Sequence, residues 1–245
     1  MKISKTQSTC ALILASSLIV SAPVTRADSH GEGEPAPVTA AEFEPGTYVQ
    51  KAVTMLEGQM GESADKRVPK KLLKAAKCVA IFPQIGQVGL GIGGKFGRGM
   101  VSCRGEDGSF GAPLFTRLSS LTFGAQIGAQ QVSLLMLIMS DKGLSTLLNG
   151  KPIVGAEAGI SAGPVGREAG VDLDVFLQSP IISYSRSQGL FAGAVLEGAV
   201  IFRAKQVNKE LYGDFETTDE LLFKRREVPE RVRALGEALD KYTES

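Results

Sequence analysis

The chain has a single histidine, no tryptophan and three cysteines. His30, the only histidine, stands in an acidic, Pro- and Gly-containing stretch. The sequence therefore excludes Ser-His-Asp and Cys-His catalysis, as well as zinc sites built on histidines. Three cysteines are also too few for a four-cysteine zinc site. We expect no enzyme, no metal and no cofactor.

Two nucleotide-binding patterns match in part. Residues 89–94 (GLGIGG) fit GxGxxG, and Lys95 extends them toward a P-loop, but Phe96 stands where that loop needs Ser or Thr. The following residues are typical of a strand, whereas both motifs need a helix there. We interpret the glycines as close β-packing. Asp172 and Asp174 would share one face of a strand and could serve acid/base chemistry or bind Ca²⁺, but we interpret that face as solvated.

The first 27 residues have the composition of a secretory signal peptide. Lys2 and Lys5 precede the apolar run 11–20, and Thr25 and Ala27 are small enough for cleavage after Ala27. The run is too short for a comfortable membrane span, although an uncleaved anchor is the alternative. We expect an exported protein of the periplasm or cell envelope, with peripheral membrane association.

Cleavage there would change both charge and cysteine count. It removes three cations, so 24 Lys and Arg face 26 acids, a net charge of −2. No global basic field is left for nucleic acid, and we expect no nucleic-acid partner. Cys78 and Cys103 remain, and an even pair predicts one disulfide in an oxidising compartment. Two buried free thiols are the alternative.

The pattern of apolar and turn residues predicts an α+β fold. Residues 28–45 are acidic and rich in Pro and Gly, which predicts a flexible linker. Alternating glycines should leave strand faces bare, so that another element can approach closely. We expect a Gly-rich, twisted, barrel-like antiparallel sheet with packed helices. Helices are expected over 47–60, 69–77, 141–148 and 229–242, with a capping box at 217–220. Strands are expected over 79–82, 88–96, 97–104, 109–115, 120–138, 154–175 and 181–202, with 97–104 and 109–115 forming a hairpin.

Charge order is the most informative feature. From Asp28 to Asp65 there are eight acids and one cation, whereas from Lys66 to Arg104 there are nine cations and no acid. On a helix the first six of these cations would fall within an arc of about 140°. Cations near a helix start oppose the macrodipole and favour an anion there. We expect six residues to bind anionic lipid, with a plain solvated basic face as the alternative: Lys66, Arg67, Lys70, Lys71, Lys74 and Lys77.

Several motifs, in order, resemble those of the SYLF-domain family. They are VPKKLLKAAKCVAIFPQIGQVGLGIGGKFGRGMVSCR from Val68, then FGAQIGAQ, SDKGLSTLL, AGISAGPVGREAG and SYSRSQGLFAGAVLEGAV from Ser183. The resemblance covers about residues 48–213. It divides the chain into a signal peptide (1–27), a linker (28–45), a SYLF-like domain (46–213) and a helical C-terminal extension (214–245).

The resemblance implies lipid binding, directed at phosphoinositides in eukaryotic members, through a basic segment that matches Lys66 to Lys77. Fungal members also bind actin. Because the chain has a signal-like start and no SH3 or FYVE module, we expect actin not to be a partner. Ser183, Tyr184 and Arg186 of the SYSRS motif could form a hydrogen-bonded corner or part of a polar pocket. If the strands that carry Cys78 and Cys103 pair, a bridge between them is feasible.

These expectations combine into one function and one alternative. The first is non-enzymatic binding of anionic membrane phospholipid by a bacterial exported member of the family. The alternative is a structural or protein-interaction module of the bacterial cell envelope, with another envelope protein as partner.

Overall fold

The computed structural model describes residues 44–61, 67–154, 158–164, 173–185, 196–214, 217–224 and 227–244, apart from the side chains of 89–92, 122–129 and Leu173. All of them belong to one compact unit, Val38–Ser245. The expected signal peptide and nearly all of the expected linker lie outside the described residues. No described helix is both long and apolar enough to cross a bilayer.

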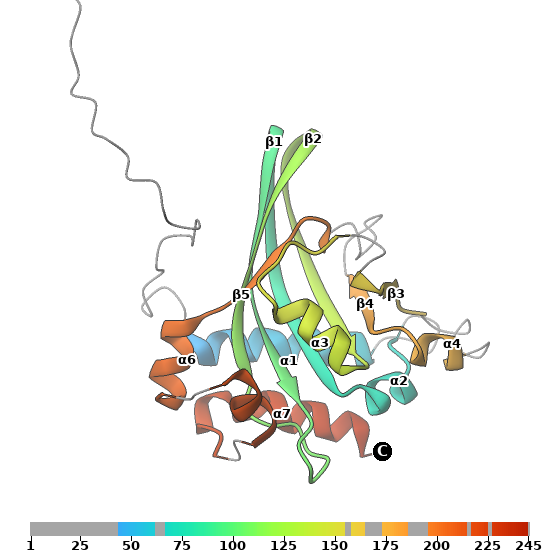
Figure 1. Ribbon diagram of the computed structural model, residues 1–245, viewed down its shortest axis with the longest axis vertical. Helices are drawn as coiled ribbons and strands as arrows, with labels where there is room; N and C mark the ends of the chain where they lie inside the picture. The colour runs from blue at the N-terminus through green and yellow to red at the C-terminus, as the bar shows by residue number, and fades with distance from the viewer. Residues whose placement is uncertain are drawn as a thin grey trace, which may run out of the picture. The chain divides into compact units, whose positions relative to one another are not determined.

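Two long strands flanked by short elements make up the chain (Figure 1). In order, the elements are α1 (Pro45–Gly61), α2 (Lys70–Ala75), β1 (Cys78–Cys103), β2 (Leu114–Ile138), α3 (Asp141–Leu148), β3 (Ile160–Ala162), α4 (Leu173–Leu177), β4 (Ile181–Ser185), β5 (Val200–Arg203), α6 (Lys205–Tyr212), the π-helical turn η4 (Glu220–Lys224) and α7 (Glu230–Thr243).

Strands β1 and β2 pair antiparallel along almost their whole length, from Cys78 opposite Ile138 to Val101 opposite Leu114. We call this pair the ribbon. The prediction that a strand ends at Pro83 is wrong, because β1 continues through it. The pairing shifts register between Phe82 and Ile85, and such an irregularity accommodates a residue without an N–H.

The ribbon must fold back on itself. Cys78 and Cys103 are the first and last residues of a 26-residue strand, yet their Cα atoms lie 4.0 Å apart and their side chains form a disulfide. A straight strand of that length would span about 85 Å. A second register shift, between Leu90 and Ile92, falls near the middle of β1.

Glycines allow the two halves of β1 to touch. A methyl group added at Gly99 would lie 2.6 Å from the carbonyl oxygen of Ile81, and one added at Gly97 would lie 2.8 Å from Cγ1 of Ile85. Neither contact leaves room for a side chain. The prediction that alternating glycines permit close approach is confirmed at these two positions.

The described strands form one sheet in the order β1-β2-β4-β3, with β5 also paired to β2. The α+β class is confirmed. The sheet is mixed rather than purely antiparallel, because β3 runs parallel to β4. Strands β1 and β3 end the order, so the described part of the sheet is open and not barrel-like.

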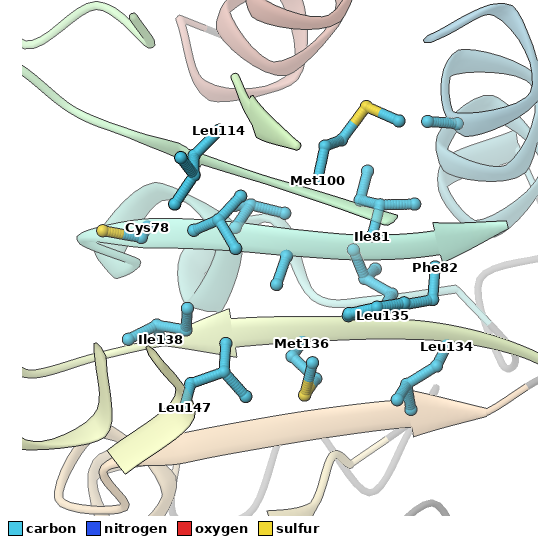
Figure 2. Close-up of a cluster of buried hydrophobic side chains, with 14 of the residues drawn as sticks. Cys78, Ile81, Phe82, Met100, Leu114, Leu134, Leu135, Met136, Ile138 and Leu147 are labelled. Carbon is cyan, nitrogen blue, oxygen red and sulfur yellow. The ribbon is translucent and has the colours of Figure 1, made fainter. Parts of the chain in front are cut away.

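The core fills the proximal half of the folded ribbon, which we define as the half near the disulfide between Cys78 and Cys103. Figure 2 shows Phe82 of β1 and Leu134 and Leu135 of β2 within a cluster that Leu147 of α3 completes. The predicted helix cap is confirmed, since the Ser140 hydroxyl accepts the Gly143 N–H at the start of α3. Helices α1 and α7 pack together, and the predicted apolar face of α7 is confirmed by three fully buried side chains: Val232, Leu235 and Leu239.

Candidate functional site

The basic segment, residues 67–77 of the described chain, lies at the base of the ribbon just before Cys78. Leu72 and Leu73 of α2 are fully buried, and so is Val68. These apolar anchors fix the backbone against the core, and α2 packs on α4 and α7. Four cations of the segment point outward and are exposed: Arg67, Lys70, Lys71 and Lys74.

The predicted helix is too long. Helix α2 has only six residues, and Pro69 before it has an extended backbone. Arg67 and Lys77 therefore lie outside the helix, and Lys66 lies outside the described residues. The single helical arc of six cations is wrong. The short helix also lacks the turns that an anion site at a helix N-terminus needs, so the exposed charges alone define the surface.

Two cations of the segment have carboxylate partners. Lys77 donates a hydrogen bond to Asp141, and its ammonium group lies 6.0 Å from the centre of the Phe223 ring. Lys71 Nζ lies 3.7 Å from Asp174 Oδ1, with both side chains mostly exposed. Water screens such an exposed pair, so Lys71 is only weakly held. Asp174 belongs to α4 rather than to the predicted strand, and Asp172 lies outside the described residues.

Arg67, Lys70 and Lys74 make no ion pair within the described part of the chain. They precede the core strand β1 and stand on a surface whose other side is apolar and buried. The basic segment thus offers three unneutralised cations, with Lys71 beside them in a weak pair. This arrangement suits an anionic surface better than a single small anion, because the charged side chains are exposed side by side.

The SYSRS motif is built into the sheet at β4. The Ser183 hydroxyl donates to the Ser161 carbonyl of β3 at 3.0 Å. The Tyr184 ring lies against Gly163, where any side chain would collide with it. The Tyr184 hydroxyl is buried and has no hydrogen-bond partner in the part of the chain that the structure describes, and burial raises its pKa. Arg186 lies outside the described residues, so the polar pocket stays a prediction.

One buried cation lies on the ribbon. Lys95 is 4% exposed, as is Ser120 opposite it on β2. Burial lowers the pKa of Lys95, and the charge of Glu197 partly opposes that shift. Among the described residues, no group of three or more His, Cys, Asp or Glu is placed to hold a metal ion.

Sequence reasoning missed a cavity of about 470 Å³ between α7 and the residues that follow the β1–β2 turn. Asp240 Oδ1 accepts the Phe110 N–H at 3.1 Å, and burial raises the pKa of Asp240. Glu227 and Glu237 add carboxylates to the wall, and Arg233 adds one cation. Glu237 and Asp240 are three residues apart and therefore share a helix face. This spacing was the only indication of the cavity in the sequence.

Comparison with known proteins finds similarity over most of the domain. Residues 119–242 match the family model Ysc84, described as "Las17-binding protein actin regulator". Protein YSC84 of Saccharomyces cerevisiae is 31% identical over 169 residues, which are 68% of this chain and 36% of that protein. SH3 domain-containing YSC84-like protein 1 of Homo sapiens is 28% identical over 181 residues, 74% of this chain and 53% of that protein.

A third relative, the SH3 domain-containing protein PJ696.02 of Schizosaccharomyces pombe, is 33% identical over 162 residues, 65% of this chain and 37% of that protein. The chain thus spans between about a third and about half of the length of these relatives. The expectation that actin is not a partner is wrong, because the matched family is described as an actin regulator and a further relative, from Saccharomyces cerevisiae, is named LAS seventeen-binding protein 3.

Proposed function

The chain belongs to the Ysc84 family, the SYLF-domain family that its motifs resemble, and from this premise we propose that it is a non-enzymatic binding module for anionic phospholipid surfaces. The family is described by binding and regulation rather than by a reaction. The ligand we propose is the phosphate layer of a membrane, contacted by the exposed cations of the basic segment.

One observation carries this proposal. Arg67, Lys70 and Lys74 are exposed and have no carboxylate partner among the described residues, while buried Leu72 and Leu73 fix the segment that bears them. Each cation at an anionic surface contributes about 1 kcal/mol, so three give about 3 kcal/mol, or roughly a hundredfold in affinity. Binding of this strength is measurable but weakens as the salt concentration rises.

The test is co-sedimentation with vesicles of phosphatidylcholine and phosphatidylglycerol at a three-to-one ratio. The variant R67E/K70E/K74E should lose at least about a hundredfold in affinity. A matched control, K142E/K151E/K224E, makes the same change in net charge at exposed lysines elsewhere. If both triple variants lose affinity equally, net charge rather than the basic segment is responsible, and the proposed site is rejected.

A second candidate function is protein binding of the kind named for the family. The matched model covers 119–242, which leaves the basic segment outside and includes α7 with its part of the cavity. An acidic wall formed by Glu227, Glu237 and Asp240 suits a basic segment of a partner. Actin co-sedimentation tests this: E227K/E237K should reduce binding, while R67E/K70E/K74E should not. Absence of wild-type binding to filaments would reject the candidate for actin.

Export forms part of the proposal as well. The signal-like first 27 residues and the disulfide between Cys78 and Cys103 both suit an oxidising compartment. Chain recovered from such a compartment should begin near Asp28 and contain no free thiol. An intact N-terminus together with free Cys78 and Cys103 would reject export.

A further inference from the structure

The distal half of the folded ribbon, which lies away from the disulfide and around the register shift between Leu90 and Ile92, exposes apolar side chains. Within the described residues, Val88 is 53% exposed, Phe96 57% and Leu121 71%. The other two large apolar side chains that are exposed, Val154 and Val175, lie off the ribbon. We call Val88, Phe96 and Leu121 the tip patch. Figure 1 shows this end of β1 and β2 extending beyond the helices.

The strand register places two members of the tip patch on one face. Phe96 lies opposite Ser119, and Leu121 lies opposite Gly94, so they are diagonal neighbours. The Phe96 ring also covers Gly94, since a methyl group added there would lie 2.8 Å from it. Phe96 and Leu121 therefore form one continuous apolar surface across both strands.

The same part of the ribbon lacks exposed charge. Residues 78–94 of β1 and 118–138 of β2 contain no Asp, Glu, Lys or Arg. Lys95, which follows on β1, points to the opposite face and is buried, while Arg98 and Arg117, which lie opposite each other beside the patch, are half-buried. Soluble proteins usually protect exposed strands with charged side chains. A projecting end with so little exposed charge offers few contacts to a partner that is recognised by charge, and it suits an apolar layer.

The depth of contact is limited by the backbone. An open strand edge in hydrocarbon would leave N–H and C=O groups unpaired, which the bilayer core does not tolerate. The interface between headgroups and acyl chains supplies water to those groups, and aromatic side chains favour that depth. The tip patch can therefore enter the interface without the ribbon crossing the bilayer.

We propose that the tip patch inserts into the interfacial layer of a lipid bilayer and anchors the protein there independently of lipid charge. This inference rests on the proposed function as a membrane-binding module, but it uses different residues and a different force. Val88 is ten residues beyond Cys78, on the order of 33 Å along an extended strand, so the tip patch and the basic segment are separate contacts. A bilayer that meets both would lie along the ribbon.

The absence of tryptophan makes the test direct. Leu121→Trp introduces a single fluorescent tryptophan at the tip patch. Val175→Trp introduces one next to Asp174, the partner of Lys71. Val154→Trp is the control at an exposed apolar position on neither surface. Each variant is mixed with phosphatidylcholine vesicles and with vesicles that also contain phosphatidylglycerol at a three-to-one ratio. All three positions are exposed, and thermal unfolding verifies that each variant is folded.

The L121W emission should shift to the blue on both kinds of vesicle and keep its shift at about 1 M salt, where electrostatic contacts are screened. Adding Phe96→Ser should weaken vesicle binding of L121W by about five- to tenfold. The V154W emission should not change. If the L121W emission does not shift on either kind of vesicle, or if the V154W emission shifts equally, the inference is overturned.

Two further outcomes separate this inference from the proposed function. If L121W is silent while V175W shifts on anionic vesicles, the tip patch fails and the basic segment stands. If L121W shifts on neutral vesicles while R67E/K70E/K74E binds anionic vesicles like the wild type, the tip patch stands and the basic segment fails. A blue shift without vesicles that grows with protein concentration means that copies pair through the tip patch, which also overturns the inference.

Discussion

The two halves of the ribbon use the same strands in opposite ways. In the proximal half, Phe82 and Leu135 are fully buried under helices and the disulfide joins the ends of β1. In the distal half, Phe96 and Leu121 are exposed, Lys95 is turned inward, and the neighbouring Arg98 and Arg117 are half-buried. Large apolar residues occur in both halves, so hydrophobicity alone does not distinguish core from surface. What distinguishes the halves is whether another element covers the face.

The largest expected effect tests this contrast with one substitution in each half. Phe82→Ala should lower the free energy of unfolding by about 3–5 kcal/mol, because it leaves a cavity in the core. Phe96→Ala should change it by less than about 0.5 kcal/mol, because that ring packs little. Urea unfolding of both variants measures the difference. Equal losses would mean that the distal half is as well packed as the proximal half.

The next effect concerns the closure of the proximal half. The variant C78A/C103A removes the disulfide without leaving a buried hydroxyl, and it should lose about 3 kcal/mol, since the bridge closes a loop of 25 residues. The free energy of unfolding of the wild-type protein should fall by the same amount when reductant is present. An unchanged urea midpoint on adding reductant would show that the bridge does not form or does not stabilise the fold.

The smallest effect lies at the junction of α7 with the turn of the ribbon. Burial raises the pKa of Asp240, so its contribution to folding is fully present below its ordinary pKa and is lost as pH rises through the raised value. Asp240→Asn keeps an acceptor for the Phe110 N–H but carries no charge. The free energy of unfolding of this variant should equal that of the wild type near pH 3 and exceed it slightly at about pH 7.

Two measurements complete the Asp240 prediction. Asp240→Ala removes the acceptor altogether and should cost about 1–2 kcal/mol at either pH. Urea midpoints of the three proteins at both pH values decide the outcome. A constant difference between the wild type and Asp240→Asn would contradict the pKa shift.

Local signals in the sequence predicted much of the fold. Ser140 and Asp141 predicted α3 and its cap, and the spacing of Val232, Leu235 and Leu239 predicted α7, because both depend on neighbours within one helix. The glycines predicted that another element approaches closely, but not which one. The segment that packs against Gly99 is the other half of its own strand. Pro83 was wrongly predicted to end a strand. Strand β1 accommodates this proline because its pairing with β2 shifts register there, and the sequence of β1 alone does not reveal that shift.

The candidate site was predicted in part for similar reasons. The acid-free block predicted the basic segment, and Arg67, Lys70 and Lys74 are exposed together. The pairing of Lys77 with Asp141, 64 positions away, depends on tertiary structure and left no local signal. The tip patch was not predicted, because Phe96 and Leu121 look like core residues until the fold leaves their face uncovered.

The most direct test of the account is the salt dependence of wild-type binding to vesicles of two compositions. Affinity for vesicles that contain phosphatidylglycerol should exceed affinity for pure phosphatidylcholine at about 0.1 M salt, and that excess should vanish near 1 M. Such a result assigns the difference to exposed cations. Equal affinity for both compositions at low salt would contradict the claim that the basic segment binds anionic lipid.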